Sequence, residues 1–286
     1  MLPDPDPVEH RLMRRMIRKL ADKTSLFLLR FRFFDRLVGF LQYQRTRMLR
    51  RRVEARLRES GEYGDVVLRG PFHGMKYPSA DAHWVSCRFE KIIGCYEVEL
   101  YPSIRRMQEA QRHYTDIINV GAAEGFFSVG LGLIFPSAKL VAYESEPEKT
   151  QVMRDLAALN GVADQLVIEG FCDPEALAAL PVGERPLLIC DVDGYETELM
   201  DPEAVPWLAT ADIVLELHDC LKPGITELMR SRFEKTHKLD MITSTGVAYE
   251  EFPVLRQLSF PEIHAMTNSD RAAMQDWFVM EPLADK

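Results

Sequence analysis

The residues with the clearest chemical potential form a glycine-containing turn that follows an apolar strand. Residues 119–127 read Asn-Val-Gly-Ala-Ala-Glu-Gly-Phe-Phe. Small residues such as Gly121 and Gly125 let the backbone approach a ligand, and the helix expected behind them offers free N–H groups. Glu124 lies inside the turn, where its charge would repel a phosphate but attract a sulfonium or amino group. The turn therefore predicts a nucleotide-like ligand with a cationic part.

The glycine spacing argues against common phosphate-binding loops. The turn is G-x-x-x-G, whereas a dinucleotide site needs G-x-G-x-x-G, and the chain has no G-x-x-x-x-G-K-[ST] motif. An NAD-linked oxidoreductase would share the expected sheet and a ribose-binding acid, so it stays an alternative that an NADH titration would test. A non-catalytic cofactor-binding module, anchored by its N-terminal residues, is the second alternative.

An acid at the end of the second expected strand is placed to bind a ribose. Glu144 follows Gly125 by nineteen residues, and an acid at this position of a doubly wound fold accepts hydrogen bonds from ribose hydroxyls. Glu146 is the competing candidate, but it is better placed to stabilise the first turn of a helix expected from Pro147. We therefore assign the ribose to Glu144.

Acids and a histidine follow the fourth and fifth expected strands. Asp191 and Asp193 follow the fourth, and His218 and Asp219 follow the fifth. Because the carboxyl ends of parallel strands meet at one ligand-binding edge, we expect these side chains near a cofactor. His218 is the predicted base for a hydroxyl acceptor, with a structural histidine as the alternative. Asp191, His218 and Asp219 could instead hold Mg²⁺, although a histidine makes this set less favourable for a hard cation.

A regular alternation of apolar strands and amphipathic helices positions these residues. Such alternation predicts crossover units and a parallel sheet covered by helices on both faces. The expected strands cover residues 116–120, 139–144, 165–170, 186–191, 212–217, 238–243 and 276–282. Helices are expected from Ala123, Pro147 and Gly224 and near Pro174 and Glu196. The predicted fold is a doubly wound α/β domain with a mostly parallel, seven-stranded, Rossmann-like sheet and an N-terminal helical extension.

Taken in order, these motifs resemble the S-adenosylmethionine contacts of class I methyltransferases. The resemblance rests on NVGAAEGFF, AYESEP, Asn160-Gly161 and GFC. Within that superfamily, ICDVDGYETELM at residues 189–200 resembles the D-V-E-G-x-E signature of FkbM-like methyltransferases. Asp193 stands where the signature has Glu, so its side chain is one methylene shorter. The resemblance covers residues 115–282.

The resemblance implies S-adenosylmethionine as the cofactor. Residues of the turn would line its methionine part and face its cationic groups: Asn119, Gly121, Ala123, Glu124 and Gly125. Glu144 would bind the ribose. Phe171 and Cys172 would flank the adenine, where a ring can stack on the base. Asp191 would face the cofactor amino group or the methyl acceptor.

The same resemblance implies O-methylation of a sugar or another hydroxyl-bearing small molecule or glycan. Asp191, Asp193 and His218 are then the candidate catalytic residues, with Glu196 just beyond them. The chain has no D-P-P-[YF] or N-P-P-[YF] motif and no Pro-Cys pair. These absences argue against methylation of adenine N6, cytosine N4 and cytosine C5.

The net charge of −9 hides an uneven distribution. Residues 1–60 hold 16 Lys and Arg against 7 Asp and Glu, while the other 226 residues hold 19 against 37. We divide the chain into a basic helical arm (1–60), a bridging, substrate-side region (61–113) and a cofactor-binding domain (114–286). The acidic body argues against nucleic acid as a partner.

Two helices are expected in the arm. One covers residues 12–20, and the other follows Thr24 and ends at Gly61 and Gly64. Their apolar residues fit packing on the body, self-association or, given the arginines beside phenylalanines, contact with an anionic membrane.

Composition and cysteine usage indicate a globular intracellular protein. The 286 residues are 47% apolar and 28% charged, and the N-terminal part lacks the roughly 20 apolar residues of a membrane span. No secretory signal is visible, and five cysteines without a C-x-x-C pair fit reduced thiols. We expect a cytoplasmic location, with the inner face of the membrane as a peripheral site for the arm.

Overall fold

The computed structural model describes residues 32–79, 85, 87–244, 246–267 and 275–283. The chain divides into two compact units, Met1–Leu57 and Arg58–Lys286. The helix expected at 12–20 lies outside the described residues. The second expected helix is present as α2 (Arg32–Glu59), which ends just before Gly61, whose φ is +76°.

Helix α2 exposes a run of apolar side chains. The large ones are Leu37, Val38, Phe40, Leu41, Tyr43 and Met48. Residues 36–53 contain six arginines and no acid. Within the described ranges, no helix combines the length and the apolar character needed to cross a bilayer.

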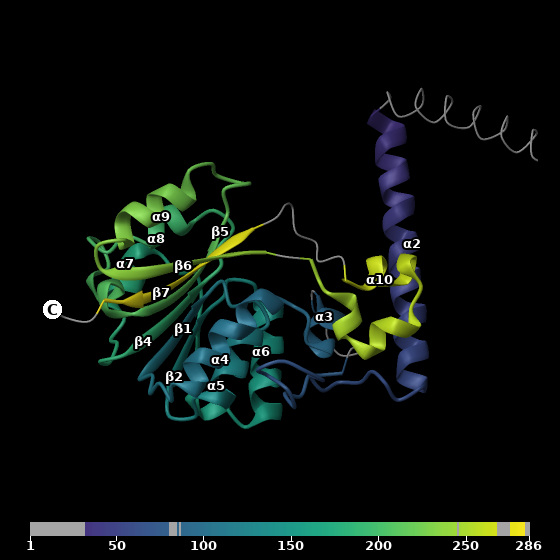
Figure 1. The fold of residues 1–286 in the computed structure, drawn as a ribbon, viewed down its shortest axis with the longest axis horizontal. Coiled ribbons are helices and arrows are strands. Elements are labelled where there is room, and N and C mark those ends of the chain that lie inside the picture. Colours follow the sequence, from purple (N-terminus) through teal and green to yellow (C-terminus); the bar gives the residue numbers. More distant parts are fainter. Residues whose placement is uncertain (1–31, 80–84, 86, 245, 268–274, 284–286) are drawn as a thin grey trace, which may run out of the picture. The chain divides into compact units, whose positions relative to one another are not determined.

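The second unit is built on one seven-stranded mixed sheet. Its strands are β1 (Asp116–Val120), β2 (Lys139–Tyr143), β3 (Leu166–Glu169), β4 (Pro186–Cys190), β5 (Asp212–Leu217), β6 (His237–Thr243) and β7 (Asp276–Pro282). The spatial order is β3-β2-β1-β4-β5-β7-β6, and β7 runs antiparallel to both neighbours (Figure 1). The mostly parallel, seven-stranded Rossmann-like sheet predicted from the sequence is confirmed.

Helices cover both faces of this sheet. The helices of this unit are α3 (Arg88–Ile93), α4 (Tyr101–Glu109), α5 (Phe126–Ile134), α6 (Pro147–Asn160), α7 (Pro174–Ala179), α8 (Glu196–Leu199), α9 (Ile225–Phe233) and α10 (Phe260–Thr267), and α3 and α10 lie beside each other away from the sheet. Short 3₁₀ turns occur at Val98–Leu100, Ala163–Gln165, Pro206–Thr210, Tyr249–Glu251 and Pro253–Gln257. Helices α4, α5 and α6 lie on one face and α7, α8 and α9 on the other (Figure 1).

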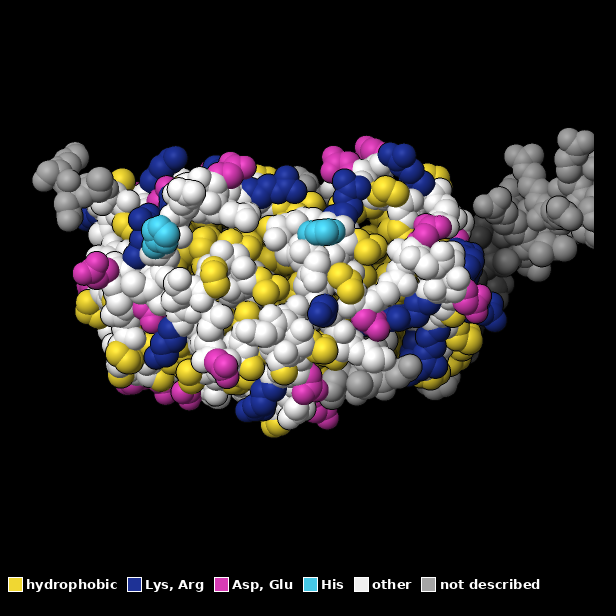
Figure 2. Space-filling view, turned by 90° about the horizontal axis from the view of Figure 1, so that it is seen from below, with side chains coloured by type: hydrophobic (Ala, Val, Ile, Leu, Met, Phe, Trp, Pro, Cys, Tyr) yellow, Lys and Arg dark blue, Asp and Glu magenta, His cyan; other side chains and the backbone are white. Residues whose placement is uncertain are grey.

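The central strands are apolar runs because both of their faces are covered. Every residue of β1, β4 and β5 is buried, as expected for parallel strands between two helical layers. Each fully buried large apolar side chain contributes roughly 1.5–3 kcal/mol relative to an exposed one. The face seen in Figure 2 carries apolar side chains near its centre and scattered charged side chains around them.

The strand order places a binding crevice at the carboxyl edge of the sheet. Chain order runs outward from β1 toward β3 on one side and from β4 toward β5 on the other. The loops after β1 and β4 therefore leave in opposite directions and open a crevice between them. The turn with Gly121, the Asp191 segment and His218 all follow strands at this edge.

Candidate functional site

An open pocket of about 150 Å³ lies at the carboxyl edge of the sheet. It is formed by the ends of β1 and β2 and by the loops after β2, β3 and β4. Its lining residues are Val120, Gly121, Tyr143, Glu144, Ser145, Gly170, Phe171, Cys172, Val192, Tyr195 and Leu199. Four of the predicted cofactor-binding residues are among them: Gly121, Glu144, Phe171 and Cys172.

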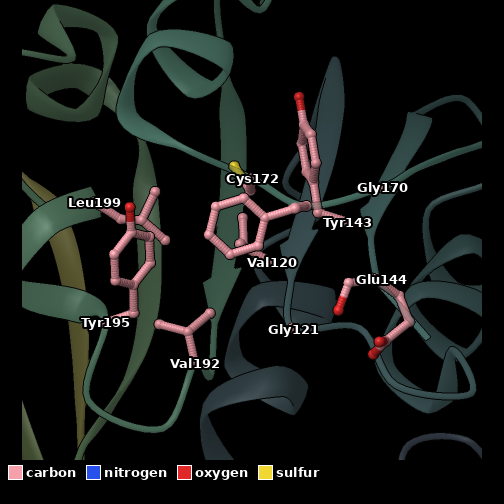
Figure 3. A pocket seen from close by; sticks show the side chains of 11 residues that line it. Val120, Gly121, Tyr143, Glu144, Gly170, Cys172, Val192, Tyr195 and Leu199 are labelled. Atoms are coloured by element: carbon pink, nitrogen blue, oxygen red, sulfur yellow. The ribbon is translucent and has the colours of Figure 1, made fainter.

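Glu144 and Glu146 differ in where they lie. Glu144 lines the pocket on the side opposite Tyr195 (Figure 3). One of its oxygens, Oε1, accepts a hydrogen bond of 2.8 Å from the backbone N–H of Glu146, which holds the carboxylate in place. Glu146 does not line this pocket and pairs instead with Lys149 at 2.7 Å.

The adenine side of the predicted site is aromatic. Phe171 is 65% exposed, and its ring centroid lies 5.6 Å from that of Tyr195 at an interplanar angle of 44°. Cys172 is buried beside them, and burial together with the charge of Asp173 raises the pKa of its thiol to about 12. The thiol is therefore neutral and leaves this side of the pocket uncharged. The rings of Phe171 and Tyr195 can contact a flat apolar ligand there.

The glycines of the turn are required by the protein itself. Gly121 has φ +77°, and a Cβ there would overlap the carbonyl oxygen of Asp191. Gly125 has φ +88°, and a Cβ there would lie 2.5 Å from the Met153 side chain. The sequence pattern predicts close approach of a ligand at these glycines, whereas the structure shows close approach of the segment that follows β4 and of α6.

Four predicted cofactor residues of the turn, namely Asn119, Ala123, Glu124 and Gly125, do not line this pocket. Asn119 is buried and donates from Nδ2 to the Ser128 hydroxyl at 2.9 Å, which ties β1 to α5. Ala123 has φ +47°. Glu124 is buried and pairs with Lys91 of α3 at 2.5 Å.

Lys91 balances the charge of Glu124 within the chain. The sequence pattern predicts a cationic group of the ligand opposite this carboxylate. Both side chains are almost fully buried, at 3% and 4% exposure. The Tyr77 hydroxyl donates to the same Glu124 oxygen at 3.3 Å, and Lys91 Nζ lies 4.6 Å from the Tyr96 ring centroid. This network joins the bridging region to the glycine turn.

Replacing Lys91 with Met is expected to lower the free energy of unfolding by about 3 kcal/mol, because it leaves the Glu124 carboxylate buried without its counter-ion. Chemical denaturation measures the change. Lys149→Met is the matched control, since the exposed Lys149–Glu146 pair is worth about 1 kcal/mol or less. Equal losses in the two variants would contradict a structural role for the buried pair.

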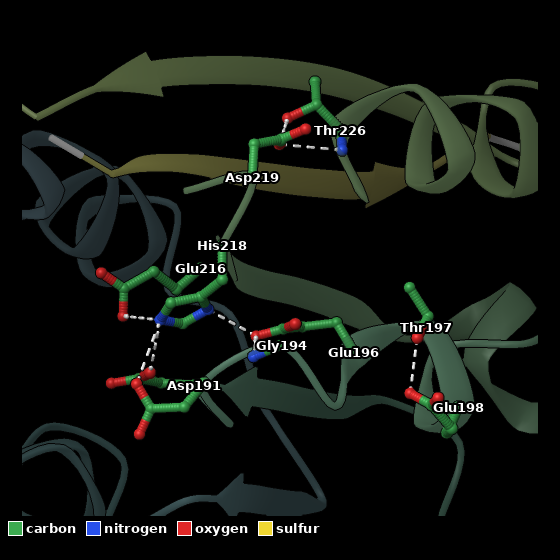
Figure 4. A network of polar contacts seen from close by, with 10 residues as sticks. Asp191, Gly194, Glu196, Thr197, Glu198, Glu216, His218, Asp219 and Thr226 are labelled. Atoms are coloured by element: carbon green, nitrogen blue, oxygen red, sulfur yellow. Dashed lines mark hydrogen bonds and ion pairs between the residues drawn. The ribbon is translucent and has the colours of Figure 1, made fainter. Parts of the chain in front are cut away.

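A buried histidine meets four carboxylates at the ends of β4 and β5. The Nδ1 atom of His218 lies 2.5 Å from Oε1 of Glu196. Its Nε2 atom lies 3.6 Å from a carboxylate oxygen of Asp191 and 3.6 Å from one of Asp193. An oxygen of Glu216 lies 3.8 Å from the same Nε2 (Figure 4). We call these five residues the carboxylate–histidine cluster.

The surroundings in the cluster raise the pKa values of His218 and Asp191. Burial alone would lower the pKa of His218. The hydrogen bond and charge of Glu196, followed by the charges of the two aspartates, outweigh burial and raise the pKa of His218 above its usual value. Burial raises the pKa of Asp191 against the opposing effects of a hydrogen bond with Glu216 and the charge on His218. His218 and Asp191 therefore each hold a proton more tightly than the isolated side chain does.

Asp219 lies apart from the cluster. Its carboxylate accepts hydrogen bonds from the backbone N–H groups of Gly224, at 2.9 Å, and Thr226, at 3.0 Å, at the start of α9 (Figure 4). Although burial acts in the opposite direction, these bonds and the Thr226 hydroxyl lower the pKa of Asp219. The Mg²⁺ set that included Asp219 is therefore not brought together. The ligand atoms of Asp191, Asp193 and His218 do lie within 4.8 Å of one another.

Glu216 and Glu196 belong to the cluster although no role was predicted for them, and each has a recognisable signal in the sequence. Glu216 interrupts the apolar strand DIVLEL and is 3% exposed. Glu196 closes the DVDGYE motif and is fully buried. Acids are rarely buried without a partner, so an acid inside an apolar strand or at a buried helix start points toward the site.

Comparisons with known proteins give weak structural similarities. No family model matches the chain, and no curated protein matches it. The O-methyltransferase TomG from Streptomyces achromogenes is 14% identical, with a TM-score of 0.41 over 63% of this chain and 80% of that one. A precorrin-6y C5,15-methyltransferase from Geobacter metallireducens is 15% identical, with a TM-score of 0.40 over 62% of this chain and 87% of that one. The fold assignment rests on the strand order of the chain itself.

Proposed function

We propose that the protein is an S-adenosylmethionine-dependent methyltransferase that acts on a hydroxyl oxygen. The observation that carries the proposal is the juxtaposition, at one sheet edge, of the pocket and the carboxylate–histidine cluster. Val192 and Tyr195 line the pocket, and they alternate along the chain with Asp191, Asp193 and Glu196 of the cluster. A methyl donor bound in the pocket would therefore place its methyl group beside the imidazole of His218.

The residues of the pocket fit the parts of this cofactor. The Glu144 carboxylate, fixed through Oε1, has a second oxygen to accept ribose hydroxyl protons. Phe171 and Tyr195 offer ring faces to an adenine. Asp191 of the cluster directly precedes Val192 of the pocket lining, and it would face the amino group of the methionine part.

The chemistry assigned to the chain is proton removal and orientation. Bound S-adenosylmethionine supplies an electrophilic methyl group on sulfur. His218 Nε2 would accept the proton of the acceptor hydroxyl as that oxygen is methylated, and positioned bases of this kind contribute roughly 10²–10⁴-fold. Asp191 and Asp193 would stabilise the imidazolium that results. Their oxygens already lie 3.6 Å from Nε2.

The acceptor class comes from the resemblance to FkbM-like methyltransferases, carried by residues 189–200. A sugar or another hydroxyl-bearing small molecule or glycan is the proposed acceptor. Several carboxylates surround the imidazole, so an acceptor with an anionic group beside the reacting hydroxyl would be repelled. Transfer of labelled methyl from S-adenosylmethionine to neutral sugars, phenols and sugar phosphates tests the class. Calorimetry that detects neither S-adenosylmethionine nor its demethylated product bound to the protein would overturn the proposal.

Glu144→Ala is expected to weaken cofactor binding by about 1–3 kcal/mol, the usual loss when hydrogen bonds to a charged group disappear. Glu146→Ala removes a neighbouring charge that does not line the pocket, so it should change binding much less. Calorimetric titration of both variants measures the difference. The reverse order of effects would show that the ribose acid is misassigned.

We propose that the arm governs location or assembly and takes no part in methyl transfer. Deleting residues 1–60 should preserve cofactor affinity while removing either self-association or binding to anionic vesicles. Salt separates the two, because the Debye length shrinks to about 3 Å at 1 M, which weakens lipid attraction but not apolar packing. If the truncated protein loses cofactor binding, or if the full chain neither self-associates nor binds vesicles, the proposal fails.

A further inference from the structure

A carboxylate that the proposed reaction does not use directly is buried completely at the start of α8. Glu196 has no exposed surface. Its Oε1 contacts His218 Nδ1 at 2.5 Å and accepts a hydrogen bond of 3.2 Å from the Gly194 N–H. Its Oε2 is also buried and has no hydrogen-bond partner among the described residues. Burying such an oxygen without a hydrogen-bond partner costs free energy.

The first effect of Glu196 is on the tautomer of the imidazole. A carboxylate at Nδ1 accepts a hydrogen bond from the N–H at that position, and a hydrogen bond at one ring nitrogen decides which tautomer is present. The neutral His218 ring then carries its proton on Nδ1 and its lone pair on Nε2. Carboxylate oxygens of Asp191, Asp193 and Glu216 lie 3.6, 3.6 and 3.8 Å from Nε2. The lone pair thus faces the side of the cluster where an acceptor hydroxyl would lie.

The second effect is on the turn that carries Asp193. Asp193 has φ +49° and Gly194 has φ +98°, and a left-handed conformation is unfavourable for a non-glycine residue such as Asp193. The hydrogen bond from the Gly194 N–H to Glu196 Oε1 closes this turn. One carboxylate oxygen therefore holds both the imidazole and the strained turn that brings Asp193 to Nε2.

We propose that Glu196 is the positioning residue of the site, which fixes His218 as its Nδ1–H tautomer and holds the Asp193–Gly194 turn beside Nε2. The consequence for methyl transfer rests on the proposed function. The tautomer and the turn do not, and they can be measured in the protein without any acceptor.

The first experiment is ring-nitrogen NMR of the full-length protein labelled with ¹⁵N-histidine. A His218→Asn variant identifies the His218 signals. At a pH where this ring is neutral, we expect the chemical shifts of a protonated Nδ1 and an unprotonated Nε2. A His218 ring with its proton on Nε2 in the unaltered protein would overturn the proposal, and this result does not depend on the folding of any Glu196 variant.

Substitutions then test the carboxylate itself. In Glu196→Gln the carboxamide can offer an N–H to Nδ1, so we expect the His218 signals to move toward the Nε2–H tautomer. Glu196→Asp should keep the original tautomer. Glu198→Gln is the matched control, because Glu198 is exposed and pairs with Lys222 at 3.0 Å. Unchanged His218 signals in Glu196→Gln would overturn the proposal.

Methyl transfer provides a separate measurement. Once labelled transfer has identified an acceptor, Glu196→Gln should lower kcat at least about tenfold, since the wrong tautomer disables a histidine base. The affinity for S-adenosylmethionine should stay within about twofold, because Glu196 does not line the pocket. An unchanged kcat would contradict the positioning role. Absence of transfer in the unaltered protein would instead count against the proposed function and leave the NMR result standing.

Discussion

His218→Asn is expected to abolish methyl transfer while leaving cofactor binding intact. The Nε2 lone pair is the proposed proton acceptor, and removal of a positioned base costs roughly 10²–10⁴-fold in rate. Asn is smaller and neutral, so it cannot take the proton from a hydroxyl. The imidazole belongs to the cluster and not to the pocket lining, so the dissociation constant of S-adenosylmethionine should stay nearly unchanged. Label transfer and calorimetry measure the two quantities.

The neighbouring aspartate provides the matched control for this variant. Asp219→Asn changes the charge of the next residue, but the Asp219 carboxylate binds the start of α9 and lies outside the cluster. It should keep most of the activity. Transfer within about twofold of the unaltered protein in His218→Asn would show that another group removes the proton, because loss of a working base costs far more. Equal losses in both variants would indicate that charge at this edge matters more than the imidazole.

The alternation of strands and helices was sufficient to predict the sheet. The apolar run 116–120 is β1, and the 276–282 strand is β7, as predicted. The first helix was placed too early, because α5 begins at Phe126 and not at Ala123. The residues before it include left-handed conformations at Gly121, Ala123 and Gly125, which a helix cannot contain. Periodicity alone does not reveal such a backbone path.

The site was less predictable because its contacts join distant segments. The position of Glu144 at the pocket follows from the strand end that precedes it, and its role as the ribose acid stays a prediction. The pairing of Glu124 with Lys91 joins residues 33 apart, and no local pattern indicates it. Asp219 could have been assigned differently from the sequence, since an acid shortly before a helix start often binds the free N–H groups of that helix.

Gly121→Ala is expected to cause the largest loss of stability of any single substitution in the turn. A methyl group at residue 121 would overlap the carbonyl oxygen of Asp191 and lie 2.9 Å from its carbonyl carbon. Overpacking costs about 1–3 kcal/mol or more, and the left-handed conformation adds roughly 1–2 kcal/mol. The backbone can give way little, because the Asp191 N–H bonds the Val120 carbonyl at 3.0 Å and the Gly121 N–H bonds the Tyr143 carbonyl at 3.1 Å. Denaturant unfolding should show a loss of roughly 3–5 kcal/mol.

Gly161→Ala separates the two causes of this loss. Gly161 has φ +72°, but a Cβ there would meet nothing within 4 Å, so only the conformational cost of roughly 1–2 kcal/mol applies. The difference between the variants therefore measures the contact between the Gly121 turn and the Asp191 segment. If the two substitutions cost the same, that contact is not tight in solution. If Gly121→Ala has normal stability but fails to bind S-adenosylmethionine, the glycine is needed for the close approach of the ligand. This is the reason that the sequence pattern predicts.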